Sequence, residues 1–130
     1  MFLLDTNTLI YFFRGQGRVA EHLFDAPRTT IAVATVSIYE LETGIAKSTQ
    51  PAKRRKQLAA LLDAVKILPF DRSAARHAAE LRVALEKNGR PIGPLDTLIA
   101  GTALAHQATL VTHNTGEFKR VPKLTLLDWY

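Results

Sequence analysis

The segment Phe2-Leu3-Leu4-Asp5-Thr6-Asn7 decides how this chain begins to fold. Three apolar residues followed directly by an acid, a hydroxyl and an amide predict a short buried strand that ends in a turn or at a helix start. The apolar stretch from Leu9 to Phe13 then stops at Arg14-Gly15, which predicts a helix closed by glycine. Ligands of open parallel sheets bind at the carboxyl ends of the strands, so Asp5 is a candidate functional residue.

Segments of these two kinds alternate through the rest of the chain. Further strands are predicted at residues 30–35, 66–70, 109–112 and 124–127, with Pro69 placing the 66–70 segment near a sheet edge. Further helices are predicted at 19–24, from Ser37 onward, at 53–64, at 72–87 and from 93 to 107. In the 72–87 helix, the residues expected to face the core are Ala75, Ala78, Ala79, Val83 and Leu85. The alternation predicts an α/β fold, a mostly parallel sheet of four to five strands with helices on both faces.

The composition is that of an ordinary globular protein. The chain has 130 residues, 47% of them hydrophobic and 22% charged, which predicts a single domain over residues 1–130. It has no cysteine, which excludes disulfide scaffolds and thiol chemistry and agrees with a cytoplasmic location. No apolar run approaches the length of about 20 residues that a membrane helix needs, and the N-terminus lacks the basic region of a signal peptide.

The charges are distributed unevenly. Seventeen Lys and Arg against twelve Asp and Glu give a net charge of +5, so a polyanion such as nucleic acid is a candidate partner. All the basic residues lie outside the segments 1–13, 29–46 and 91–118, which contain only the acids Asp5, Glu40, Glu42, Asp96 and Glu117. A carboxylate in an apolar segment needs a partner, and here that partner is a distant cationic side chain or a metal ion.

Four of these acids are expected to approach one edge of the sheet. Asp5 and Glu117 follow predicted strands, while Glu40 and Asp96 stand in the first turns of predicted helices. Acids in first helical turns also stabilise the helix dipole, and Ser37-x-x-Glu40 matches a capping box, so a purely structural role remains open for Glu40. Several carboxylates without histidine or cysteine suit Mg²⁺ or Mn²⁺, and such sites are typical of phosphodiester cleavage.

Other catalytic motifs are absent or misplaced. Gly15-Gln16-Gly17-Arg18-Val19-Ala20 matches a dinucleotide-binding pattern, but a helix-like stretch separates it from the first strand. The histidines lack metal-ligand spacing, and we expect each to be a surface or structural residue: His22, His77, His106 and His113.

Four segments together resemble PIN-domain proteins of the VapC toxin type. They are 3–7 with Arg14-Gly15, 37–44, 93–100 and 110–118. The resemblance implies a PIN-like three-layer fold and an Mg²⁺- or Mn²⁺-dependent endoribonuclease, the toxin of a type II toxin–antitoxin system that inhibits translation. It also implies a homodimer that a cognate VapB-type antitoxin binds in a higher assembly. Some relatives cut tRNA in the anticodon region, including initiator tRNA, so tRNA is an expected substrate.

The resemblance also assigns roles to residues. It implies that the metal ligands and catalytic residues are Asp5, Glu40, Asp96 and Glu117, the last standing where many members have Asp. Glu42 competes with Glu40, but the Glu-Leu-x-x-Gly spacing favours Glu40. Groups expected to orient ligands or waters are Thr6, Asn7, Thr112 and Asn114. Candidates for contact with the RNA backbone are Arg14, Lys119 and Arg120.

Two other function classes remain open. A phosphatase using Asp5 as nucleophile would have a second Asp two residues later, where this chain has Asn7. A non-catalytic RNA- or protein-binding module would not need all four acids. The basic run Lys53-Arg54-Arg55-Lys56 is either a solvated helix surface or a phosphate-steering one, because four consecutive helical residues cannot share a face.

Overall fold

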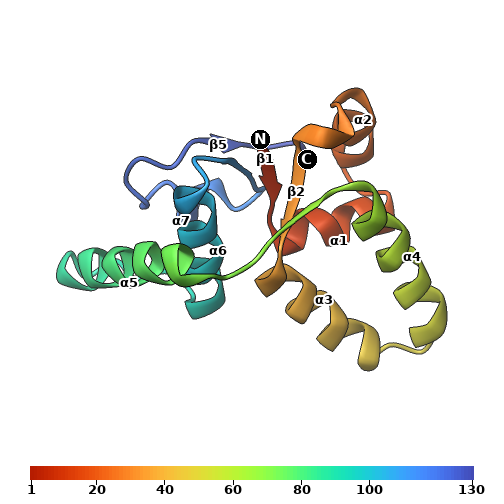
Figure 1. Cartoon of the computed structure of the whole chain (residues 1–130), viewed down its shortest axis with the longest axis horizontal. Coiled ribbons are helices and arrows are strands. Elements are labelled where there is room, and N and C mark those ends of the chain that lie inside the picture. The colour runs from red at the N-terminus through yellow and green to blue at the C-terminus, as the bar shows by residue number, and fades with distance from the viewer.

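The computed structural model describes residues 1–130 and has three layers, with a sheet between two groups of helices (Figure 1). The strands are β1 (Phe2–Leu4), β2 (Ile31–Ala34), β3 (Lys66–Leu68), β4 (Thr109–Val111) and β5 (Leu126–Leu127). The helices are α1 (Thr6–Arg14), α2 (Val19–Asp25), α3 (Thr35–Ala46), α4 (Pro51–Ala64), α5 (Arg72–Lys87), α6 (Pro94–Ala105) and α7 (Thr115–Phe118). A 3₁₀ turn, Arg28–Thr30, precedes β2. None of the helices combines the length and apolar character needed to cross a membrane.

The sheet has the order β3-β2-β1-β4-β5, and every neighbouring pair is parallel. Leu4 is in register with Val33 on one side and with Val111 on the other, so β1, β2 and β4 end together. The parallel α/β sheet predicted from the sequence is therefore confirmed, with β3 at an edge. This register brings the residues that follow the three strands to one edge of the sheet.

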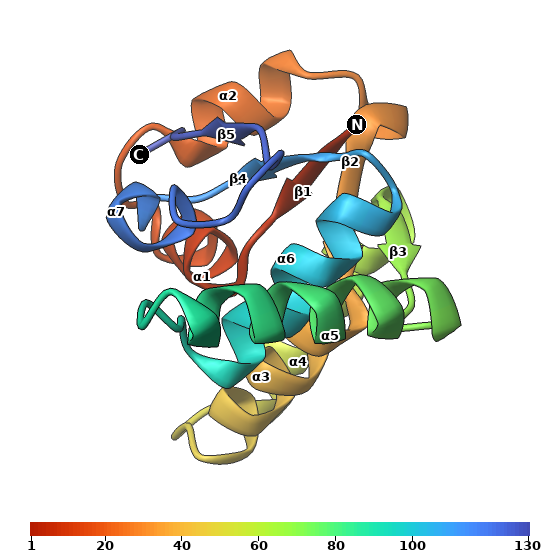
Figure 2. The ribbon, with the colours of Figure 1, turned by 90° about the vertical axis from the view of Figure 1, so that its left-hand side faces the viewer.

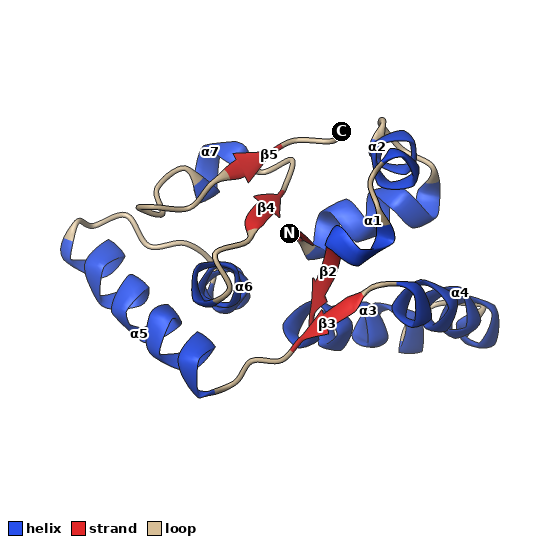
Figure 3. Ribbon diagram, turned by 45° about the horizontal axis from the view of Figure 1, so that its top comes forward, coloured by secondary structure: helices blue, strands red, loops and turns tan.

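Side-chain alternation along the strands creates a core on each face of the sheet. Leu3, Ala32 and Leu110 pack in the cluster that α5 and α6 cover, whereas their successors Leu4, Val33 and Val111 pack beneath α1, α2, α3 and α4. Figure 3 shows α5 and α6 on one side of the strands and α1, α2 and α4 on the other. The three inner strands β1, β2 and β4 are almost fully buried because both of their faces are covered, whereas the edge strands β3 and β5 are partly exposed.

Three predictions about the helices were wrong in detail. Helix α3 begins at Thr35, two residues before Ser37. Helix α7 was not predicted, because four residues are too few to show a helical period. In α5 the buried residues are Ala74, Ala78, Leu81 and Leu85, whereas Ala75, Ala79 and Val83 are exposed. The cap at Asp71 starts the helix, and the buried face then follows regular spacings of four, three and four residues.

Gly15 and Gly17, the glycines of the pattern that resembles a dinucleotide-binding motif, form the turn that follows α1. Gly15 ends α1 in the left-handed conformation at φ 65°. Gly17 also has a positive φ of 62°, and a Cβ placed on it would lie 2.6 Å from the carbonyl oxygen of Tyr130. Gly15 therefore ends α1, and Gly17 leaves room for Tyr130 to pack against it. No strand directly precedes them, so they do not form a dinucleotide-binding loop.

Helix α5 lies across α6 at close range (Figure 2). Gly101 of α6 makes this possible, since a Cβ there would lie 2.8 Å from both the backbone nitrogen and the Cα of Ala78. Gly44 of α3 is also helical, but a Cβ there meets nothing within 4 Å.

We expect Gly101→Ala and Gly44→Ala to change stability in opposite directions. The Gly101 substitution should lower the free energy of unfolding by about 1–3 kcal/mol, because the backbones of α5 and α6 must separate. The Gly44 substitution should raise it by about 0.5–1 kcal/mol, because alanine loses less conformational entropy in a helix. Urea unfolding of both variants measures the two effects, and equal destabilisation would contradict the close approach of α5 and α6.

Candidate active site

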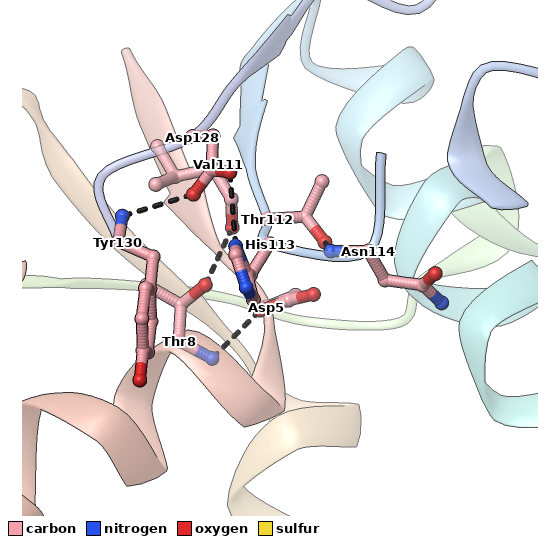
Figure 4. Close-up of polar contacts among 8 residues, drawn as sticks. All are labelled: Asp5, Thr8, Val111, Thr112, His113, Asn114, Asp128 and Tyr130. Carbon is pink, nitrogen blue, oxygen red and sulfur yellow. Dashed lines mark hydrogen bonds and ion pairs between the residues drawn. The ribbon is translucent and has the colours of Figure 1, made fainter. Parts of the chain in front are cut away.

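Asp5 stands at the end of the central strand and serves both the fold and the site. Its side chain is only 3% exposed, and its Oδ1 accepts the N–H of Thr8 at 2.8 Å, which caps α1. Its own N–H donates to the carbonyl of Val111 at 3.0 Å and so extends the pairing with β4 (Figure 4). Burial raises the pKa of Asp5, and the nearby charge of Asp128 adds to the rise, while hydrogen bonding from Thr112 and Thr8 opposes it.

The pKa of Asp96 responds to the charges of the three other carboxylates, which therefore lie in the same region. Asp96 lies in the first turn of α6 and is partly buried. Burial raises the pKa of Asp96 to about 6, with further contributions from the negative charges of Glu117, Asp5 and Glu40. These four acids come from separate parts of the chain, and the parallel register brings them near one another.

Glu40 is held by a hydroxyl pair. The Thr6 hydroxyl donates to Glu40 Oε1 at 2.7 Å, and Ser37 Oγ lies 3.0 Å from Thr6 Oγ1, close enough to donate to it in turn. Helix α3 begins at Thr35 with Ala34 as its cap, so Ser37 is buried inside the helix and forms no capping box with Glu40. The capping box predicted from the sequence for Glu40 is therefore wrong, and Glu40 stands in the second turn of α3 rather than in its first.

Glu42, the competitor of Glu40, is engaged elsewhere. Its Oε2 lies 3.2 Å from Nε of Arg55 on α4. This ion pair braces α3 against α4, and Glu42 has no part in raising the pKa of Asp96.

Glu117 is fixed at both carboxylate oxygens. Oε1 accepts the N–H of Gly93 at 3.0 Å, and Oε2 accepts Nδ2 of Asn114 at 2.7 Å. These hydrogen bonds, together with the charge of Arg120, lower the pKa of Glu117 and keep it ionised. Glu117 thus ties α7 to the residues that precede α6, and it remains charged beside Asp96.

The other residues singled out from the sequence lie around this centre in different ways. Thr112 Oγ1 accepts the N–H of Asn114 at 3.0 Å, which fixes the turn after β4. Asn7 is exposed and its side chain makes no hydrogen bond. Lys119 is exposed at the end of α7, whereas Arg120 donates from Nη1 to the carbonyl of Pro91 at 3.1 Å.

A cluster beside Asp5 was missed by the sequence reasoning. His113 Nδ1 lies 2.9 Å from Asp128 Oδ2, and the imidazole stacks on Tyr130 with ring centroids 4.2 Å apart (Figure 4). Burial of Asp128 raises its pKa, but the N–H of Tyr130 and the His113 ring outweigh this and lower it overall. No local pattern marks Asp128, because its approach to Asp5 depends on the pairing of β5 with β4.

The donors present suit a hard divalent cation. No three His, Asp or Glu side chains stand close enough together to form a complete metal cage. Mg²⁺ does not need one, since it is commonly held by one or two carboxylates with waters and substrate phosphates. The site offers only oxygen donors, and a cation between them would relieve the repulsion that raises the pKa of Asp96.

We expect the stability gained by Asp96→Asn to depend on pH. The folded-state pKa of Asp96, about 6, lies above the ordinary value of 3.8, so ionising this carboxylate costs stability as pH rises. In EDTA, the melting temperature of the variant relative to wild type should therefore increase from about pH 4 to pH 6.5 and level off above about pH 7. Thermal melts across this range test the sign.

Asp63→Asn provides the control, since Asp63 is an exposed carboxylate of α4 without an ion pair. A variant Asp96→Asn that is less stable than wild type at every pH would show that the carboxylate is mainly a structural group.

Comparison with known proteins agrees with this architecture. Residues 2–124 match the family model described as PIN domain. The "tRNA(fMet)-specific endonuclease VapC" of Shigella flexneri is 33% identical over 128 residues, covering 98% of this chain and 97% of that protein. "Ribonuclease VapC2" of Rickettsia felis is 35% identical over 131 residues, covering 99% and 98%.

A solved structure shares the whole fold. The chain superimposes with a TM-score of 0.92 and 34% identity on a chain of "VapBC2 from Rickettsia felis bound to a DNA fragment from their promoter", covering 99% of this chain and 98% of that one. The match extends over all five strands and the helices around them, so the resemblance noted in four sequence segments is confirmed. This chain belongs to the PIN-domain family, and within that family to the VapC group.

Proposed function

We propose that this protein is a divalent-metal-dependent endoribonuclease and the toxin of a toxin–antitoxin pair. The observation that carries the proposal is the electrostatic coupling of Asp96 to Asp5, Glu40 and Glu117 at the carboxyl edge of the sheet. Relatives of nearly the same length are named ribonuclease and endonuclease, which supports this assignment. The net charge of +5 on the whole chain favours a polyanionic substrate around this acidic centre.

The proposed roles follow from the contacts of each side chain. Asp5, Glu40 and Asp96 would hold Mg²⁺ or Mn²⁺, and Glu117 would add a fourth negative charge from its fixed position. The cation supplies Lewis-acid stabilisation of the phosphate and activation of water. Thr6 fixes one oxygen of Glu40 at 2.7 Å, which leaves its other oxygen, Oε2, free to bind.

The partners follow from the relatives. A VapB-type antitoxin would bind and inhibit the enzyme, as the complexes of related chains with VapB indicate. The Shigella flexneri relative is named for initiator tRNA, so tRNA is the first substrate to test, with inhibition of translation as the outcome. The homodimer remains a prediction.

The alternative functions have less support. Asn7 occupies the place where an aspartate-nucleophile phosphatase would have its second acid, and its side chain is exposed without a partner. A binding module with no catalytic role would not require four carboxylates to face one another against their own repulsion.

Asp5→Asn and Asp96→Asn should each reduce RNA cleavage to below about a tenth of the wild-type rate, because metal activation contributes several kcal/mol. Asparagine caps a helix as well as aspartate does, so Asp5→Asn removes the charge while keeping the start of α1. Cleavage of an initiator-tRNA transcript with Mg²⁺, with Mn²⁺ and with EDTA measures both variants and the metal requirement.

Asp71→Asn is the matched control, because Asp71 caps α5 through the N–H of Ala74 at 3.0 Å and has no role in the site. It should cleave at the wild-type rate. Undiminished cleavage in EDTA, or by folded Asp96→Asn, would refute the metal-site assignment.

A further inference from the structure

A cavity of about 230 Å³ opens beside Glu40, between α1, α3 and α4. This volume lies below the about 300–1,000 Å³ of sites that enclose drug-sized ligands, so the cavity has room for part of one nucleotide and not for a longer segment. Its lining combines apolar side chains with two arginines, a glutamine and Glu40. The residues that matter here are Ile10, Phe13, Arg14, Leu41, Arg54 and Gln57.

Two arginines line this cavity, and neither has an anionic partner. Arg14 ends α1 and Arg54 lies on α4, and neither forms an ion pair with any carboxylate of the chain. The next residue, Arg55, is paired with Glu42 and does not line the cavity. The basic run on α4 is therefore divided, with one arginine used to brace the helices and its neighbour left free.

The chemistry of the cavity points to a ligand that combines a flat apolar group with a phosphate. Phe13 and Ile10 offer a surface for a base, and two arginines in one cavity suit the oxygens of a phosphate. Gln57 can both donate to and accept from a base edge, and its amide has no other hydrogen bond. Glu40 borders the same cavity, so a nucleotide seated there would lie next to the carboxylate centre.

We propose that this cavity binds the RNA nucleotide adjacent to the cleaved phosphodiester, with Arg14 and Arg54 holding its phosphate and Phe13 and Gln57 contacting its base. The assignment rests on the proposed ribonuclease function and adds the substrate-positioning residues to it. Arg54 is then a substrate-binding residue, which could not be distinguished by sequence from its basic neighbours Lys53, Arg55 and Lys56.

Arg54→Gln and Arg55→Gln form a matched pair, since each removes one positive charge from the same exposed stretch of α4. Steady-state cleavage of the tRNA transcript with Mg²⁺ should show KM raised about tenfold or more for Arg54→Gln, the size of one lost charge-assisted hydrogen bond. kcat should change little, and Arg55→Gln should leave KM within about twofold, as expected for an exposed ion pair. Equal KM values for the two variants would overturn the proposal.

Gly44→Leu tests the cavity without removing a charge. Gly44 lines the cavity, and a side chain there enters open space, so the protein should fold at least as stably as wild type. KM should nevertheless rise, because the leucine occupies the volume assigned to the nucleotide. An unchanged KM in a well-folded Gly44→Leu protein would contradict the assignment.

A binding experiment separates this proposal from the proposed function. Fluorescence anisotropy of a labelled single-stranded RNA oligonucleotide on the Asp96→Asn protein measures affinity without cleavage. If the wild-type protein cleaves no RNA, the proposed function fails. The cavity assignment is still supported in that case if Arg54→Gln, added to the Asp96→Asn protein, weakens RNA binding and Arg55→Gln does not. If Arg54→Gln weakens only the complex with the cognate antitoxin and leaves RNA affinity unchanged, the cavity belongs to the antitoxin and the proposal is wrong.

Discussion

The repulsion among carboxylates at the carboxyl edge of the sheet is the constraint on which the site depends. Asp5 must be buried there because it both ends the central strand and caps α1. Burial raises the pKa of Asp96 on α6, and the negative charges of Glu117, Asp5 and Glu40 raise it further. The parallel register of β1, β2 and β4 brings the segments that carry these groups to one edge of the sheet, so the fold holds charge where a bound cation would stabilise it.

Three of the four carboxylates are fixed by neutral hydrogen-bond donors, and Asp96 is the one that has none. Thr8 holds Asp5, Thr6 holds Glu40, and Gly93 with Asn114 holds Glu117. Such donors orient a carboxylate without cancelling its charge, unlike an arginine or a lysine. Glu42 is the only carboxylate of residues 29–46 that is paired with a cation, and its partner is Arg55 of α4.

The strands and most helices could be predicted from the sequence because their signals are local. Apolar runs ended by polar residues mark β1 and β4, and α5 has its residues 72–87 as predicted. Helix α7 and the start of α3 could not be placed, because four residues show no period and Ala34, which caps α3, is not a residue type that signals a helix start. The inward face of α5 was misjudged because alanine is common on both of its faces.

The same division applies to the site. The acids could be selected from the sequence because their segments contain no Lys or Arg, and the choice between Glu40 and Glu42 matches their different surroundings. Asp128 could not be selected, and Ser37 was assigned to a capping box rather than to its contact with Thr6. Their relation to the site comes from the pairing of β5 with β4 and from the exact start of α3, and neither leaves a trace in neighbouring residues.

The brace between Glu42 and Arg55 has a consequence for how such a protein diversifies. It joins α3 and α4 through two exposed side chains, and none of the residues that line the nearby cavity belongs to a strand. Substitutions of the wall residues on α1 and α4, such as Arg14, Arg54 and Gln57, therefore leave the strand register unchanged and remove none of the four carboxylates. A lineage can change which nucleic acid it recognises, one helix position at a time, while the hydrolytic centre stays constant.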